Sequence, residues 1–140
     1  MRYMLDTDCC IELLRGRAPR VVERIAQVGL EQVHVSTITV GELLAGAARS
    51  ARQNENTARV VQFCASLQIV PFDDRAAARY AQTRASLEIR GTPIGPMDML
   101  IAGHALALDA TLVTTLVTGN DREFGRVVGL RVENWLARSR

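Results

Sequence analysis

Three acidic side chains fall where predicted strands and helices meet. Asp6 directly follows a short apolar run, Glu42 lies on the helix predicted at 37–48, and Asp98 lies in the first turn of a later helix. In open α/β sheets the functional crevice lies at the carboxyl ends of the strands, so we expect these acids to converge there. Carboxylates about 4 Å apart repel each other by several kcal/mol at an effective dielectric constant of about 20. A divalent cation bound between such carboxylates usually offsets this repulsion.

An all-oxygen site of this kind suits Mg²⁺ or Mn²⁺ rather than zinc. The usual chemistry there is metal-assisted attack of water on a phosphodiester, which needs no side-chain nucleophile. Each acid also has a structural interpretation, because Asp6 or Asp8 could cap the first helix and Asp98 could serve only as an acid in a first helical turn. The combination of acids, not any one of them, favours a metal site.

Short apolar runs alternate with helical patterns along the chain. The pattern predicts strands at 3–5, 32–36, 69–72, within 111–118 and at 130–133, and helices at 9–14, 19–28, 37–48, 52–67, 75–89 and 97–108. Parallel strands need crossover connections, and right-handed crossovers cover the sheet with helices. We therefore expect one domain over residues 1–140, built as a three-layer α/β/α sandwich with a mainly parallel central sheet.

The composition excludes several classes of protein. A net charge of +2 does not by itself indicate nucleic-acid binding, and all 17 basic residues are arginine, which excludes Schiff-base and Walker-lysine mechanisms. The three cysteines lack metal-type spacing, and no apolar run has the length of a membrane span. These features favour a soluble protein of the reducing cytoplasm, with its thiols as small core residues.

Five blocks of sequence resemble the PIN domains of VapC toxins, in the family's order and over nearly the whole chain. They are MLDTD at 4–8, VSTITVGEL at 35–43, IGPMDMLIAGHA at 94–105, GNDREF at 119–124 and GLRVENW at 129–135. The resemblance implies an Mg²⁺-dependent endoribonuclease, with Mn²⁺ as a substitute, that forms the toxin of a type II toxin–antitoxin pair. It further implies a homodimer, a cognate VapB-like antitoxin, and an RNA substrate of the tRNA or rRNA class.

The resemblance also assigns roles to residues. Asp6 and Asp98 match the metal-binding aspartates, Glu42 matches the third acid of the site, and Asn120 falls at the more variable fourth position. Asp8 stands where asparagine is common, which adds negative charge beside the metal.

We expect the helices at 52–67 and 75–89 to form a groove for an antitoxin helix, whose arginine would pair with the acidic site.

Two other functions remain open at this point. The motif Asp6-Thr7-Asp8 also resembles the opening of haloacid-dehalogenase-like phosphatases, in which the first Asp is a nucleophile. Those enzymes generally use a downstream lysine, which this chain lacks, and Glu42 would have no role. The other alternative is a catalytically weakened PIN module that only binds, and a nuclease assay distinguishes it from an enzyme.

A tandem repeat precedes the Asn120 segment. The sequence Thr-Leu-Val-Thr at 111–114 recurs at once at 115–118. Because strand side chains alternate with period two, an insertion of four residues keeps the inside–outside pattern, and either copy can fill the buried strand. We expect the second copy to form the strand and the first to lengthen the preceding loop, because this keeps Asn120 at the site.

Overall fold

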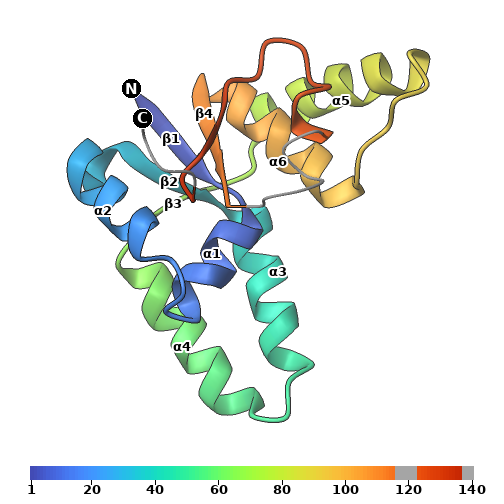
Figure 1. Ribbon diagram of the computed structural model, residues 1–140. Helices are drawn as coiled ribbons and strands as arrows, with labels where there is room; N and C mark the ends of the chain where they lie inside the picture. Colours follow the sequence, from blue (N-terminus) through green and yellow to red (C-terminus); the bar gives the residue numbers. More distant parts are fainter. Residues whose placement is uncertain (116–122, 137–140) are drawn as a thin grey trace.

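The computed structural model describes residues 1–115 and 123–136 (Figure 1). The strands are β1 (Arg2–Leu5), β2 (Val33–Ser36), β3 (Gln68–Val70), β4 (Ala110–Thr114) and β5 (Val132–Asn134). The helices are α1 (Thr7–Leu14), α2 (Pro19–Val28), the short 3-10 helix η1 (Leu30–Gln32), α3 (Thr37–Ala48), α4 (Gln53–Ala65), α5 (Asp74–Ile89) and α6 (Pro96–Ala107). Among the helices in the described ranges, none is long and apolar enough to cross a membrane.

The five strands form one parallel sheet in the order β3-β2-β1-β4-β5. The central strand β1 pairs with β2 on one side, with Tyr3 opposite Val33, and with β4 on the other, with Tyr3 opposite Thr111. The strand order therefore reverses between β1 and β4. Ligands of open α/β sheets bind at such a reversal, beside the carboxyl ends of the strands. Asp6, directly after β1, lies at this point.

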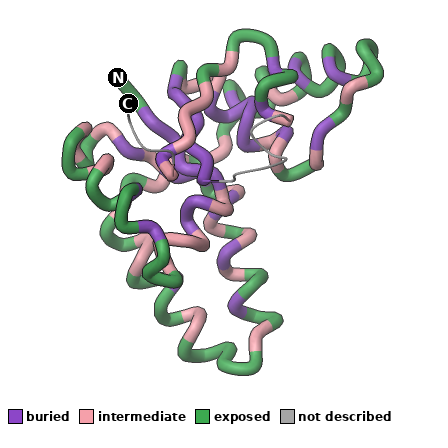
Figure 2. Tube along the Cα trace, in the orientation of Figure 1, coloured by how far each residue is buried: buried purple, intermediate pink, exposed green. Residues whose placement is uncertain are grey.

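Helices cover both faces of the sheet (Figure 1). Leu5 and Val113 face one core, which they share with α1, α2, α3 and α4, whereas Met4 and Leu112 face another, shared with α5 and α6. Figure 2 shows the buried positions concentrated along the central strands and α6, while α4 is largely exposed. The predicted three-layer α/β/α sandwich is confirmed, and its sheet is parallel throughout.

The two helices expected to form one antitoxin groove lie apart. Helix α4 packs on α3 and contributes Val60 to the core on one face of the sheet, whereas α5 packs on α6 and contributes Leu87 to the core on the other face. The expectation of a groove between them was wrong. Hydrophobic periodicity gives the buried face of each helix but not the face of the sheet that the helix covers.

The first copy of the Thr-Leu-Val-Thr repeat, not the second, forms β4. Residues 110–113 pair with β1, residues 112–114 pair with β5, and Thr115 follows the strand. The expected register was wrong because the turn after α6 is short. Asp109 has a φ of 52°, and the next residue, Ala110, already lies opposite Arg2 in the sheet. No four-residue loop separates α6 from β4.

Helices α5 and α6 approach each other most closely at Gly103. A Cβ atom at this position would lie 2.6 Å from the Tyr80 Cα and 2.7 Å from the Tyr80 backbone nitrogen. Because both atoms are backbone, we expect Gly103→Ala to lower the free energy of unfolding by about 2 kcal/mol, as overpacked cores do. Urea unfolding measures this change. Gly46→Ala is the control, since no atom lies within 4 Å of that Cβ, and it should stabilise α3 by up to about 1 kcal/mol. Equal effects at both sites would contradict the close contact.

Candidate active site

Asp6 occupies the junction between β1 and α1. Its Oδ1 caps α1 by accepting a hydrogen bond from the Cys9 amide at 2.7 Å. The residue is 1% exposed, and no donor in the described part of the chain makes a hydrogen bond of good geometry to Oδ2. A buried carboxylate oxygen without a partner costs free energy when it is ionised. The position of Asp6 thus has a structural role, through Oδ1, and leaves Oδ2 for a ligand.

Burial also changes the acidity of Asp6. The pKa of Asp6 is raised to about 7, chiefly by burial and in addition by the charges of Asp8 and Asp98. Hydrogen bonds from the Cys9 amide and the Thr114 side chain act in the opposite direction. A carboxyl group with this pKa is held in an environment that disfavours its charge. A bound cation would reverse that preference.

Asp98 lies in the first turn of α6 and is half-buried. The pKa of Asp98 is raised to about 7, chiefly by burial and in addition by the charges of Glu123, Asp8 and Glu42 and a hydrogen bond with Glu123. Since the charge of Asp98 also raises the pKa of Asp6, and Asp8 acts on both residues, the acids predicted from the sequence form one electrostatically coupled cluster. Glu123, which the sequence analysis did not assign to the site, belongs to this cluster.

Glu42 on α3 is positioned by a hydroxyl from α1. The Thr7 Oγ1 donates a hydrogen bond to Glu42 Oε1 at 2.8 Å and lies 3.2 Å from the Thr39 Oγ1. Thr39 is fully buried, three residues before Glu42 on the same side of α3. Thr7 therefore links the helix that follows Asp6 to the helix that carries Glu42.

The role of Thr7 can be tested by removing its hydroxyl. We expect Thr7→Val to lower the rate of the RNA cleavage that the resemblance to VapC toxins implies by about tenfold, equivalent to about 1.4 kcal/mol of barrier, because Glu42 loses the donor that orients it. Thr7→Ser keeps the hydroxyl and should keep most of the activity. Steady-state rates of both variants decide the question, and a Val variant that cleaves at the wild-type rate would exclude a positioning role.

His104 is a buried residue of α6 whose side chain contacts the start of α3. Its Nδ1 is 2.8 Å from the Ser36 Oγ, which also accepts a hydrogen bond from the Ile38 amide at 3.1 Å and so caps α3. Burial lowers the pKa of His104, and Phe72 packs edge-on against the ring at 5.4 Å between centroids. The pair joins the helices that carry Asp98 and Glu42. This contact could not be predicted from the sequence, because Ser36 and His104 are 68 residues apart.

The donor set fits a magnesium ion. Within residues 1–115 and 123–136, no three His, Cys, Asp or Glu side chains are spaced to ligate one ion directly. Mg²⁺ is usually bound through one or two carboxylates, with water and substrate phosphate as its other ligands. The Oδ2 of Asp6, which has no hydrogen bond of good geometry in the described part of the chain, and the carboxylate of Asp98 match that pattern. Asn120, the predicted fourth residue, lies outside the described residues.

Comparison with known proteins places this architecture in a family. The family model described as PIN domain matches residues 3–130. The chain belongs to the PIN domain family. This PIN-domain chain is 37% identical over 135 residues to the tRNA(fMet)-specific endonuclease VapC of Salmonella typhimurium, a match that covers 96% of the chain and 98% of the relative. It is 33% identical to Ribonuclease VapC2 of Rickettsia felis, with 96% and 98% covered.

Solved structures agree with the sequence relatives. The DNA-bound VapBC structure from Salmonella typhimurium matches this PIN domain with a TM-score of 0.88 and 37% identity, over 96% of this chain and 98% of that chain. VapBC-1 from nontypeable Haemophilus influenzae matches with a TM-score of 0.85 and 31% identity, over 98% and 100% of the two chains. The predicted resemblance to VapC proteins is confirmed, and the phosphatase alternative loses its support.

Proposed function

We propose that this PIN-domain protein is an Mg²⁺-dependent endoribonuclease that acts in the cytoplasm as the toxin of a VapBC-type pair. Membership in the VapC family makes it an RNA-cleaving hydrolase. The observation that carries the metal dependence is the pair Asp6 and Asp98, two carboxyl groups whose pKa values are both raised to about 7 by burial and by the charges of neighbouring acids. A divalent cation relieves both costs.

Each residue of the site has a distinct task in this proposal. Asp6 and Asp98 would hold the cation, which when bound supplies Lewis-acid polarisation of a phosphodiester and promotes ionisation of water. Glu42, oriented by Thr7, can accept a proton from an attacking water. Gly95 keeps the approach to Asp98 open, because a Cβ atom there would lie 3.3 Å from the Asp98 Oδ2.

The antitoxin is proposed to bind a cleft between α1, α3 and α4. The cleft has a volume of about 340 Å³, and Glu42 forms part of its wall. Its apolar lining consists of Ile11, Leu14, Leu43, Ala47 and Val60. A VapB-like segment with an apolar face and one arginine would fill the cleft and pair with Glu42. The related solved structures are of VapBC complexes, which supports a partner of this kind, and a homodimer is part of the same proposal.

A cleavage assay tests the proposed function. Purified wild type is incubated with mixed RNA in Mg²⁺, in Mn²⁺ and in EDTA, alongside Asp98→Asn, and the new 5′ ends are mapped. We expect cleavage that depends on the metal and on Asp98. A phosphomonoester substrate is the control for phosphatase activity. RNA left intact by folded wild type in Mg²⁺ would overturn the proposal in favour of a binding module.

A further inference from the structure

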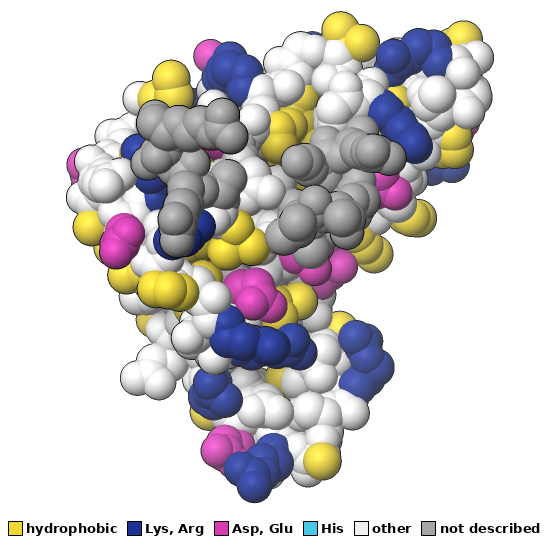
Figure 3. All heavy atoms as spheres, viewed as in Figure 1, with side chains coloured by type: hydrophobic (Ala, Val, Ile, Leu, Met, Phe, Trp, Pro, Cys, Tyr) yellow, Lys and Arg dark blue, Asp and Glu magenta, His cyan; other side chains and the backbone are white. Residues whose placement is uncertain are grey.

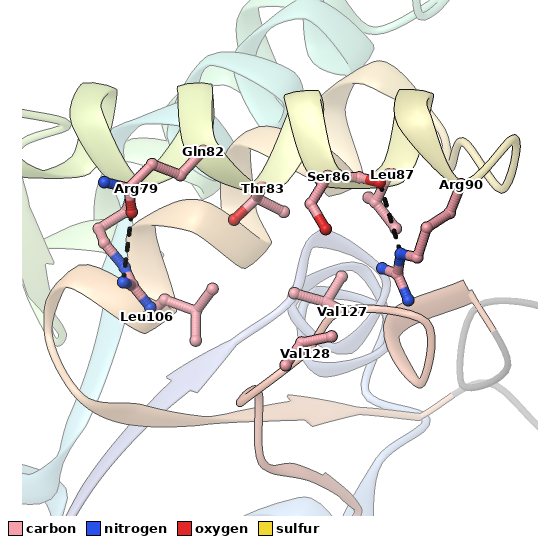
Figure 4. A pocket seen from close by; sticks show the side chains of 9 residues that line it. All are labelled: Arg79, Gln82, Thr83, Ser86, Leu87, Arg90, Leu106, Val127 and Val128. Carbon is pink, nitrogen blue, oxygen red and sulfur yellow. Dashed lines mark hydrogen bonds between the residues drawn. The ribbon is translucent and has the colours of Figure 1, made fainter.

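A further cleft lies on the α5 side of the molecule, bounded by α5, the C-terminal end of α6 and the segment at 127–128 (Figure 4). Its volume is about 140 Å³, and its lining consists of Arg79, Gln82, Thr83, Ser86, Leu87, Arg90, Leu106, Val127 and Val128. Four of the polar residues, Arg79, Thr83, Ser86 and Arg90, are spaced by four, three and four positions. They therefore lie along one face of the helix and its last turn. At 1.5 Å per residue, the two arginines are about 16 Å apart along the axis.

The arginines at this cleft are held by uncharged partners. The Arg90 Nη2 donates to the Arg126 carbonyl oxygen at 2.8 Å, and the Arg126 Nη1 donates to the Pro93 carbonyl oxygen at 3.1 Å. The Arg79 Nη1 donates to the Gln82 Oε1 at 3.4 Å. These partners restrict the guanidinium groups without cancelling their charge.

Within residues 1–115 and 123–136, carboxylates pair with other arginines but not with these three. The ion pairs found among the described residues involve Arg17, Arg24, Arg52, Arg84 and Arg131. Arg84, on the same helix as Arg79, is bound by Glu88 at 2.6 Å. No acidic residue of the described part of the chain lines the cleft. The cleft therefore presents fixed positive charge to solvent.

The cleft is connected to the acidic site through one short segment. Glu123, whose charge acts on Asp98, is followed three residues later by Arg126 and then by Val127 and Val128 at the edge of the cleft. Along α6, Asp98 and the cleft residue Leu106 are about 12 Å apart, since eight residues separate them. Figure 3 shows arginine side chains grouped over α5, beside acidic side chains nearer the middle of the molecule.

We infer that this arginine cleft binds the phosphate backbone of the RNA substrate outside the metal site. The inference rests on the proposed function in taking RNA as the ligand. An acidic cluster repels a polyanion, so contacts away from the metal have to supply attraction, and a guanidinium group binds phosphate through paired hydrogen bonds. A strip of about 16 Å is long enough to contact several successive phosphates of one strand.

The test is the salt dependence of RNA binding, measured in EDTA so that no cleavage occurs. We expect Arg79→Gln/Arg90→Gln to weaken binding by about tenfold or more and to lower the slope of log K against log salt by about 1.4 to 1.8, for two lost phosphate contacts. Arg79→Lys/Arg90→Lys keeps the charge and should keep most of the slope. Arg17→Gln/Arg52→Gln makes the same change in net charge at two exposed, ion-paired arginines and should change affinity by less than about twofold.

Cleavage assays separate this inference from the proposed function. With the Gln double variant we expect a raised KM on long RNA and an unchanged rate on a dinucleotide, which is too short to reach both sites. Wild type that binds RNA through these arginines but does not cleave it would overturn the proposed function alone. Wild-type affinity and slope in the double variant would overturn the inference. The inference would also be overturned if the double variant kept wild-type RNA affinity but no longer self-associated in sedimentation. The cleft would then be a contact between two copies of the chain.

Discussion

Replacing Asp6 with asparagine is expected to abolish RNA cleavage while stabilising the metal-free protein. Cleavage should fall by at least about a hundredfold, the scale of losing one key electrostatic group of an active site. The free energy of unfolding at pH 8 should rise by about 2 to 4 kcal/mol, since each pKa unit corresponds to about 1.4 kcal/mol and burial raises the pKa of Asp6 from 3.8 to about 7. Asparagine still caps a helix well. Urea unfolding in EDTA and cleavage rates in Mg²⁺ measure the two effects.

Asp73→Asn is the matched control for this substitution. Asp73 caps α5 as Asp6 caps α1, by accepting a hydrogen bond from the Ala76 amide at 3.0 Å, but it is exposed. Its replacement should change neither cleavage nor stability by more than a small amount. If only the Asp6 variant becomes more stable and loses activity, Asp6 is a functional group whose burial lowers the stability of the fold. If Asp6→Asn instead destabilised the protein, the main role of Asp6 would be structural.

Local patterns explain why the strands, helices and acids could be predicted. The strand β1 is a short apolar run that ends at a helix cap, and α5 begins at a capping Asp73 and ends beside Gly91. Asp6 and Asp98 stood out because each lies where a strand or loop gives way to a helix. These signals lie within a few residues of one another in the sequence.

Features that depend on contacts between distant segments could not be predicted. Nothing local distinguishes the two copies of Thr-Leu-Val-Thr, and the choice follows from the turn at Asp109 and from pairing with Arg2 at the other end of the chain. Thr7 acts on Glu42 across 35 residues. Threonine is common, and its hydroxyl acquires a role only when the fold sets a carboxylate beside it.

Without a metal, the protein is expected to lose stability as the pH rises from 5 to 8. Below a pH near 3.8 both Asp6 and Asp98 are protonated in the folded and unfolded states and contribute no difference. Between 3.8 and about 7 the unfolded chain releases these protons while the folded protein keeps them, so the folded state is progressively disfavoured. Above about 7 both carboxylates are charged and the cost is complete. Thermal unfolding in EDTA across this range measures the trend.

Magnesium should reverse this trend, because only the ionised acids bind it and binding to the folded state alone stabilises that state. At pH 8 we expect Mg²⁺ at about 100 times its dissociation constant to add about 2.7 kcal/mol. At pH 5 protons compete for Asp6 and Asp98, and the gain should largely disappear. Sodium chloride at equal ionic strength is the control for charge screening, because it does not bind as a divalent ligand does. Asp6→Asn should show a smaller loss of stability with rising pH and no stabilisation by magnesium. If metal-free stability instead increased from pH 5 to 8, the fold would not disfavour the ionised forms of Asp6 and Asp98, and the argument for a cation between them would fail.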